Sequence, residues 1–270
     1  LKELLPGLNA LFGMEYKRYG EEHKEIFEAE SSDRSFEEEV KLSGFSAAPV
    51  KGEGEAINYD TAQEAFTSRY SHETIALARA MSYTKQVKAA NVLNNAFQSS
   101  GYNGGDGVSL INTAHPLVSG GTNSNRPTTA ADLNETSLEN AVIDIAGWTD
   151  ERDLLIAAKP KKLIIPPALQ FVATRLLETE GRLGTADNDI SAVVSNGVVP
   201  QGYAINHFLT DTDAWFLTTD CPNGMKMFNR GPLSTKMEGD FDTGNVRYKA
   251  RERYSFGWSD PLGIYGSPGA

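Results

Sequence analysis

The side chains best suited to catalysis and metal binding, histidine and cysteine, are few and widely spaced in this sequence. The four histidines, His23, His72, His115 and His207, stand at least 43 positions apart, so no two of them can chelate a metal ion from one face of a helix. The single cysteine, Cys221, cannot supply a zinc cage or form a disulfide within the chain. We therefore expect no metal site, and a thiol that suits a reducing compartment.

Cys221 belongs to the one pattern that could support nucleophilic catalysis, because His207 and either Asp211 or Asp213 lie near it in the sequence. A lone cysteine is more often a small buried apolar residue, and we favour that interpretation. The sequence has no Gly-Lys pair for a phosphate-binding loop, no complete dinucleotide fingerprint and no Gly-x-Ser-x-Gly elbow. We therefore expect no catalytic site and no cofactor, and a hydrolase with an unrecognised site is the weakest alternative.

Charged residues are unevenly distributed along the chain. The net charge of −11, from 25 Lys+Arg and 36 Asp+Glu, has the wrong sign for a protein that coats nucleic acid by neutralising phosphates. Residues 1–40 contain 11 acidic and five basic residues, whereas residues 246–254 contain four basic residues and one acidic residue. These segments are either two separate solvated faces or two surfaces that are complementary between copies of the chain.

The basic segment near the end of the chain has the period-two pattern of a β-strand. One face carries Arg247, Lys249, Arg251 and Arg253, and the other carries Val246, Tyr248, Ala250, Tyr254, Phe256 and Trp258. The basic face is either a solvated sheet edge or a contact surface. As a hypothesis, we assign it to contacts between subunits, together with the acidic residues Glu37, Glu38 and Glu39 and with Lys51.

The first 40 residues lack enough apolar side chains to form a core. Leu4, Leu8, Leu11 and Phe12 have the spacing of a short amphipathic helix, but the rest of the segment is charged. We therefore expect an arm that is disordered or becomes ordered on another subunit, and that contributes little to the core of its own subunit.

Glycines and half-polar stretches in residues 43–71 predict a long hairpin with strands around Phe45 and Phe66. Such a ribbon is polar on both faces and is marginal in isolation, so another part of the assembly must cover it. A stripe of apolar residues at helical spacing then predicts a long helix from Glu73 to Phe97.

The middle of the chain mixes helix and strand signals and predicts an α+β domain. Thr136 and Glu139 form a capping box for a helix that closes at Gly147. Pro166 and Pro167 suit the first turn of a second helix. Strands are predicted at residues 163–165, 203–208, 215–218 and 225–228.

Length and hydropathy indicate a soluble globular protein. A chain of 270 residues with 40% hydrophobic composition can bury the core of one large domain or two small ones. The longest apolar run, from Leu163 to Leu169, is far shorter than the roughly 18 residues that a membrane-spanning helix needs. The N-terminus has no basic-then-apolar leader, so we expect neither a membrane segment nor secretion.

Several segments of the sequence, together with the order of elements described above, resemble the major capsid proteins of tailed double-stranded DNA bacteriophages, the Hong Kong 97-type capsid family. The resemblance covers nearly the whole chain. It rests on residues 5–13 (LPGLNALFG), 84–97 (TKQVKAANVLNNAF), 106–108 (DGV), 113–117 (TAHPL) and 247–261 (RYKARERYSFGWSDP).

The resemblance implies the Hong Kong 97-type phage capsid fold, an α+β architecture with five parts. Residues 1–42 would form the N-terminal arm, and residues 43–72 the extended β-hairpin loop over a neighbouring subunit. Residues 73–134 would be the first part of the peripheral domain with its spine helix. Residues 135–224 would form the axial domain, and residues 225–270 the returning strands of the peripheral domain.

The resemblance also implies a structural function without catalysis. The subunit would assemble with its own copies as hexamers and pentamers into an icosahedral head around double-stranded DNA, without sequence-specific binding. Portal, scaffolding and decoration proteins would be further partners, and the protein would reside in the virion after assembly in the host bacterial cytoplasm. A shell subunit of an encapsulin-like nanocompartment has the same fold and is the main alternative.

Overall fold

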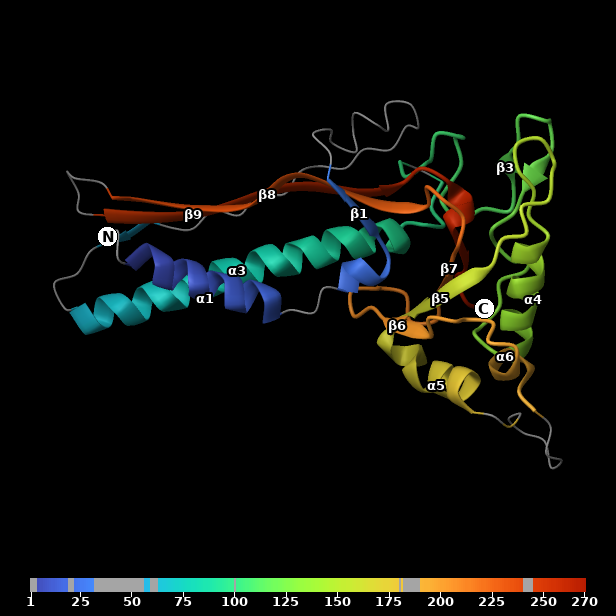
Figure 1. The fold of residues 1–270 in the computed structure, drawn as a ribbon, viewed down its shortest axis with the longest axis horizontal. Helices are drawn as coiled ribbons and strands as arrows, with labels where there is room; N and C mark the ends of the chain where they lie inside the picture. The colour runs from blue at the N-terminus through green and yellow to red at the C-terminus, as the bar shows by residue number, and fades with distance from the viewer. Residues whose placement is uncertain are drawn as a thin grey trace.

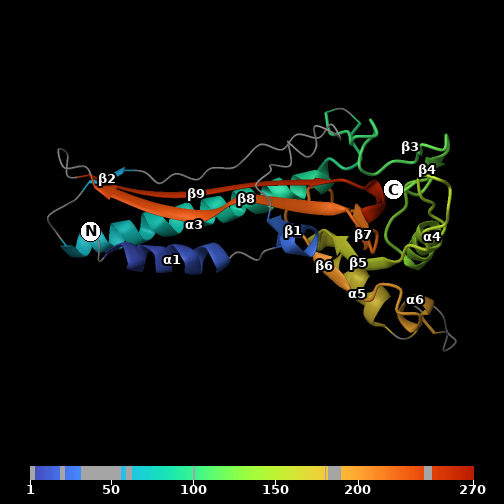
Figure 2. The ribbon, with the colours of Figure 1, turned by 45° about the horizontal axis from the view of Figure 1, so that its top comes forward.

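The computed structural model describes residues 4–18, 22–31, 56–58, 63–99, 101–179, 181, 190–239 and 245–270 of the chain. The molecule is elongated and has two parts (Figure 1). An elongated half holds two helices that lie along a long pair of strands, and a compact half holds a small sheet with further helices (Figure 2).

The longest element is helix α3 (Gln63–Asn94), which runs the length of the elongated half (Figure 1). Its buried face includes Ala78 and Leu93. The helix predicted at residues 73–97 is present, but it begins ten residues before Glu73. The strand predicted around Phe66 is wrong, because the residues that surround it include glutamine, glutamate, alanine and arginine, which favour a helix.

A four-stranded sheet packs on α3 and has the order β1-β8-β9-β2. Strands β8 (Met225–Gly239) and β9 (Asn245–Trp258) pair antiparallel along almost their full length. Strand β1 (Glu28–Ser31) lies parallel to β8, and β2 (Ala56–Asn58) lies antiparallel to β9. Segments from the start and the end of the sequence thus share one sheet.

Strand β8 is much longer than the strand predicted at residues 225–228. It continues through Gly231 and Pro232, two residue types that favour turns. In the structure the register of β8 against β9 shifts on both sides of Gly231, between Asn229 and Ser234. Proline is tolerated at such bulges because the ladder already lacks a hydrogen bond there. The strand predicted for the basic segment is confirmed as β9.

Helix α1 (Leu4–Arg18) packs on α3 and β9 of its own chain. Leu8 and Phe12 are buried against a cluster that includes Met81 and Tyr248. The expectation that this segment adds little to the core of its own subunit is therefore wrong for α1. The cause is the length of α3 and β9, which provide an apolar strip beyond the compact half.

The compact half is built on a second sheet with the order β10-β7-β5-β6. Only β5 and β6 are parallel, and the other neighbours are antiparallel. Its strands are β5 (Pro160–Ile165), β6 (Tyr203–Ile205), β7 (Trp215–Thr219) and β10 (Ile264–Ser267). The short helices around it are η1 (Glu22–Glu25), α4 (Glu135–Ala146), η2 (Pro167–Leu169), α5 (Gln170–Glu178), α6 (Ala192–Ser195) and η3 (Pro261–Gly263).

A small two-stranded sheet, β3 (His115–Pro116) with β4 (Thr122–Asn123), forms a tip next to α4 (Figure 2). Helix α4 ends at Gly147 as predicted, but its capping box is formed by Asn134 and Ser137. The predicted box of Thr136 and Glu139 lies two residues too late, because asparagine at the N-cap accepts the backbone hydrogen bond as well as threonine does.

Candidate functional site

The basic face of β9 is accessible on the described part of the strand. The side chains of Lys249 and Arg251 are exposed and that of Arg253 is half-buried, whereas Tyr248 and Ala250 between them are buried. The two-faced pattern predicted from the sequence is therefore confirmed for these residues. The assignment of the basic face to contacts between subunits stays a prediction, and the side chain of Arg247 lies outside the described part of the chain.

The acidic residues proposed as partners of this face, Glu37, Glu38 and Glu39, lie outside the described residues, as does Lys51. Three other acids of the N-terminal segment contact basic side chains of the same chain that lie outside β9. The pairs are Glu15 with Arg79 (2.6 Å), Glu22 with the His207 ring (2.7 Å) and Glu25 with Lys162. Part of the acidic excess thus serves to attach the N-terminal segment to both halves of its own subunit.

The apolar face of β9 contains one charged residue, Glu252, which the sequence analysis passed over. It is 3% exposed, and both of its carboxylate oxygens accept the Tyr16 hydroxyl at 2.9 Å. The Lys85 ammonium lies 3.3 Å from the same carboxylate and 5.0 Å from the centre of the Tyr254 ring. Burial, and then the Glu252 charge, raises the pKa of Tyr254, so its hydroxyl stays neutral. One charge on an otherwise apolar strand face was the signal for this cluster.

A second polar cluster organises the loop before β3. The His115 Nδ1 atom lies 2.5 Å from the Asp106 carboxylate, and His115 Nε2 lies 3.1 Å from the Asn125 side-chain oxygen. Burial raises the pKa of Asp106, but the hydrogen bond and charge of His115 and the Val108 N–H outweigh it, so that the pKa is lower than usual. The Asn125 amide donates to three backbone carbonyls, which ties this loop to η3 and β10.

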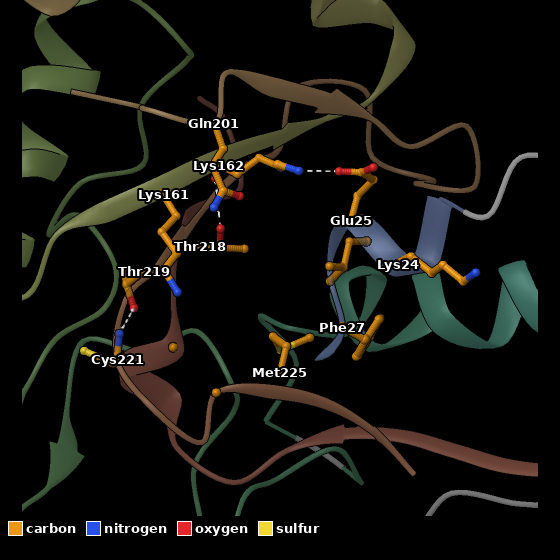
Figure 3. Close-up of a pocket in the computed structure, with 13 residues that line it drawn as sticks. Lys24, Glu25, Phe27, Lys161, Lys162, Gln201, Thr218, Thr219, Cys221 and Met225 are labelled. Atoms are coloured by element: carbon orange, nitrogen blue, oxygen red, sulfur yellow. Dashed lines mark hydrogen bonds and ion pairs between the residues drawn. The ribbon is translucent and has the colours of Figure 1, made fainter. Parts of the chain in front are cut away.

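The junction between the two halves contains a pocket of about 170 Å³ (Figure 3). It is lined by residues of the N-terminal segment, of β5 and β7, and of the start of β8, including Lys24, Phe27, Lys161 and Met225. Glu25 and Lys162 close one side of it with their ion pair. The pocket thus marks the place where the N-terminal segment meets β5, β7 and the start of β8.

Cys221 lines this pocket, and its surroundings do not activate the thiol. Burial raises the pKa of Cys221, which keeps the thiol protonated. His207, the base of the hypothetical triad, instead donates its backbone N–H and directs its Nδ1 atom to the Glu22 carboxylate. Cys221 is half-buried and packs at the edge of an apolar cluster, so it is less buried than the favoured interpretation expected.

Within the described ranges, no three His, Cys, Asp or Glu side chains are placed to hold a metal ion together. In the same part of the chain, no helix has the length and apolar character needed to cross a membrane.

Comparison with known families connects this architecture to a function. Residues 47–267 match the family model described as phage capsid protein. The chain belongs to this family. Its members are structural proteins, so the chain is a shell subunit of a capsid and not an enzyme. No curated protein matches the sequence.

Solved structures support the fold. The virus-like particle from Pyrococcus furiosus matches with a TM-score of 0.53 and 10% identity, covering 97% of this chain and 98% of that one. The capsid of Myoviridae phage XM1 matches with a TM-score of 0.47 and 9% identity over 84% of this chain and 74% of that one. The SrpI encapsulin complex from Synechococcus elongatus PCC 7942 matches with a TM-score of 0.42 and 10% identity, covering 91% of this chain and 94% of that one. The family match and the Pyrococcus furiosus particle confirm the expected Hong Kong 97-type α+β fold.

Proposed function

We propose that this chain is the major subunit of an icosahedral phage head, which assembles from its own copies as hexamers and pentamers around double-stranded DNA. The observation that carries the proposal is the family match over residues 47–267, which spans both halves of the subunit. The net charge of −11 fits a container whose wall does not hold DNA through phosphate contacts.

The proposed subunit uses its parts as the family resemblance suggests. Residues 1–42 act as the arm, and residues 43–72 act as the extended loop, whose last ten residues already belong to α3. Residues 73–134 with 225–270 form the peripheral domain, and residues 135–224 form the axial domain. The long helix α3 and the β8–β9 strand pair form the elongated framework of the peripheral domain. Head assembly takes place in the host bacterial cytoplasm, and portal, scaffolding and decoration proteins complete the particle.

The basic face of β9 serves as a contact surface between subunits in this proposal. Arg251 and Lys249 project from an exposed strand face, and the acidic residues Glu37, Glu38 and Glu39 of another copy supply the opposite charge. Lys51 belongs to the loop that lies over the neighbouring subunit. Such contacts are individually weak but are repeated at every position of a closed shell.

The contents of the particle distinguish a phage head from a protein nanocompartment of the same fold. Particles from infected or induced cells are purified, treated with nuclease and analysed for protected nucleic acid and for protein cargo. A phage head contains protected double-stranded DNA and a portal vertex. Shells that contain a single enzyme cargo and no DNA would support the nanocompartment instead.

A further inference from the structure

An exposed apolar tip stands at one edge of the compact half. It consists of Val118 from the loop between β3 and β4 and of Leu154, Leu155 and Ile156 from the loop after α4. Val118 is 88% exposed, Leu154 61% and Leu155 66%. The two loops are joined, because the Glu151 carboxylate accepts the Val118 N–H at 2.9 Å. An apolar patch of this kind on a soluble subunit marks an interaction surface.

The tip is held in shape by its backbone. Asp153 and Ala157, on either side of the three apolar residues, have φ angles of 65° and 53°, a left-handed conformation that costs free energy for residues other than glycine. The Asp150 carboxylate accepts the N–H groups of Arg152 and Leu154, and the Ile156 N–H donates to Trp148. The fold therefore maintains a strained loop that presents apolar side chains to the outside.

A groove of matching chemistry lies at the opposite edge of the compact half, between α5 and α6. It is a hollow of about 470 Å³, and its lining includes Leu177, Val193, Val194, Val198 and Val199. The hollow is open to solvent, and its lining also includes the polar residues Glu178 and Gln201, so it can receive apolar side chains with polar groups at their rim. In Figure 1 the β3–β4 sheet lies above α4, whereas α5 and α6, whose residues line the groove, lie lower, so the two surfaces of one chain are apart.

Charges beside the tip and the groove are also complementary. Arg152 and Asp153 are exposed next to the apolar tip. Glu178 lines the groove, and Arg175 lies exposed one helical turn before it on α5. Each surface thus carries one charge of each sign beside its apolar residues. A second copy of this chain offers Arg152 beside its tip as a partner for Glu178 of the groove.

We propose that the apolar tip of one subunit inserts into the α5–α6 groove of the next copy. Because the two surfaces differ and lie on opposite edges, the contact is head-to-tail, and such contacts close into rings when the rotation allows it. In the view down the shortest axis the two surfaces lie on opposite sides of α4, and we infer that a ring formed this way lies in the plane of a shell wall (Figure 1). This inference rests on the proposed shell function and assigns the capsomer contact to named residues.

The experiment places one cysteine on each surface. Leu155→Cys and Val194→Cys are combined in the full chain in which Cys221→Ser has removed the native thiol, and an oxidant is added. We expect a ladder of cross-linked oligomers on a non-reducing gel, because each copy carries both partners, and no ladder from either single variant. The control pair Ile143→Cys with Val194→Cys uses a residue on α4 of matched exposure, 68%, and should give no ladder.

Electron microscopy of the same samples separates the two proposals. If closed particles form but the test pair gives no more cross-linked oligomer than the control pair, the tip–groove contact is overturned and the shell function is retained. A ladder without closed particles supports the contact and contradicts the shell function. If neither a ladder nor closed particles form, both proposals are contradicted.

A second pair of variants tests the contact without oxidation. Leu155→Ser should raise the concentration needed for assembly by roughly tenfold or more, since each contact loses a buried leucine, whereas Ile143→Ser should leave it unchanged. Arg152→Glu should weaken assembly, and Glu178→Arg in the same chain should restore it. Equal effects of Leu155→Ser and Ile143→Ser would overturn the assignment.

Discussion

At the scale of single residues, the cluster around Glu252 shows how the subunit joins its N-terminal helix to its core. The carboxylate receives a hydrogen bond from Tyr16 of α1 and an ion pair from Lys85 of α3, so three elements meet at one buried charge. A buried ion pair adds little net stability, but removal of one member leaves the other charge without compensation. The cluster therefore selects one position of α1 rather than simply strengthening the fold.

We expect Glu252→Gln to lower the free energy of unfolding of the dissociated subunit by about 3–5 kcal/mol, because the Lys85 ammonium, 14% exposed, loses its counter-charge. Urea unfolding measures this value. Glu238→Gln, which changes an exposed glutamate on the neighbouring strand, should stay within about 0.5 kcal/mol of the wild type. Similar effects of the two variants would show that Glu252 is not a buried anchor.

Asp106 gives a pH dependence of known sign. Its pKa is lower in the folded chain than the usual value of 3.8, so it stabilises the fold above that pH, and this stabilisation is lost as the pH falls through its folded-state pKa. Asp106→Asn should therefore destabilise the subunit at pH 7, and the difference from the wild type should shrink below about pH 4. Unfolding curves across pH measure it, with the exposed Asp153→Asn as control. A difference that stays constant down to pH 2 would contradict the account.

At the scale of elements, α1 packs on its own chain, so this part of the N-terminal segment belongs to the core of its own subunit. Phe12 is fully buried and stacks on Tyr16, with Tyr248 of β9 close by. We expect Phe12→Ala to lower the free energy of unfolding by about 3–5 kcal/mol. Met14 is exposed on the same helix, and Met14→Ala should change stability by less than about 0.5 kcal/mol. If Phe12→Ala were as mild, α1 would not belong to the subunit core in solution.

The basic face of β9 belongs to the same scale. A single exposed ion pair contributes only about 0.2–1 kcal/mol, so Arg251→Glu with Arg253→Glu should leave the far-ultraviolet circular dichroism of the subunit unchanged. Assembly at moderate salt should fail or be misdirected, and a Glu→Lys pair in residues 37–39 should restore it. Charges act over roughly 8 Å at physiological ionic strength, so light scattering during a salt titration reports the contact. Wild-type assembly of the double variant across the titration would show that the face is only solvated.

The sequence predicted elements well where local signals and tertiary packing agree. The two-faced pattern of β9 and the Gly147 stop of α4 are examples, since strand alternation and a helix cap act locally. Prediction failed where distant partners decide the structure. Gly231 and Pro232 stay in a strand because β9 pairs with β8 across the bulges. Phe66 lies in the first turns of α3, ahead of the apolar stripe from which the helix was predicted. Contacts between residues far apart in sequence, such as Tyr16 with Glu252, have no local signal.

At the scale of the whole molecule, the buried apolar residues in the described part of the chain form three clusters along its length. One lies between α3 and the β8–β9 sheet, one fills the compact half, and a small one lies under α1. This distribution stabilises an elongated shape with two long edges instead of a sphere. Such a shape suits a shell subunit, which contacts its neighbours along its edges.

The central claim is that this chain builds a closed shell, and cryo-electron microscopy of the chain expressed and purified alone tests it most directly. The account predicts closed icosahedral particles whose repeating density fits the subunit described here, with the compact halves gathered around the capsomer centres. A chain that remains a monomer or small oligomer, or a closed particle whose density does not fit this fold, would contradict it.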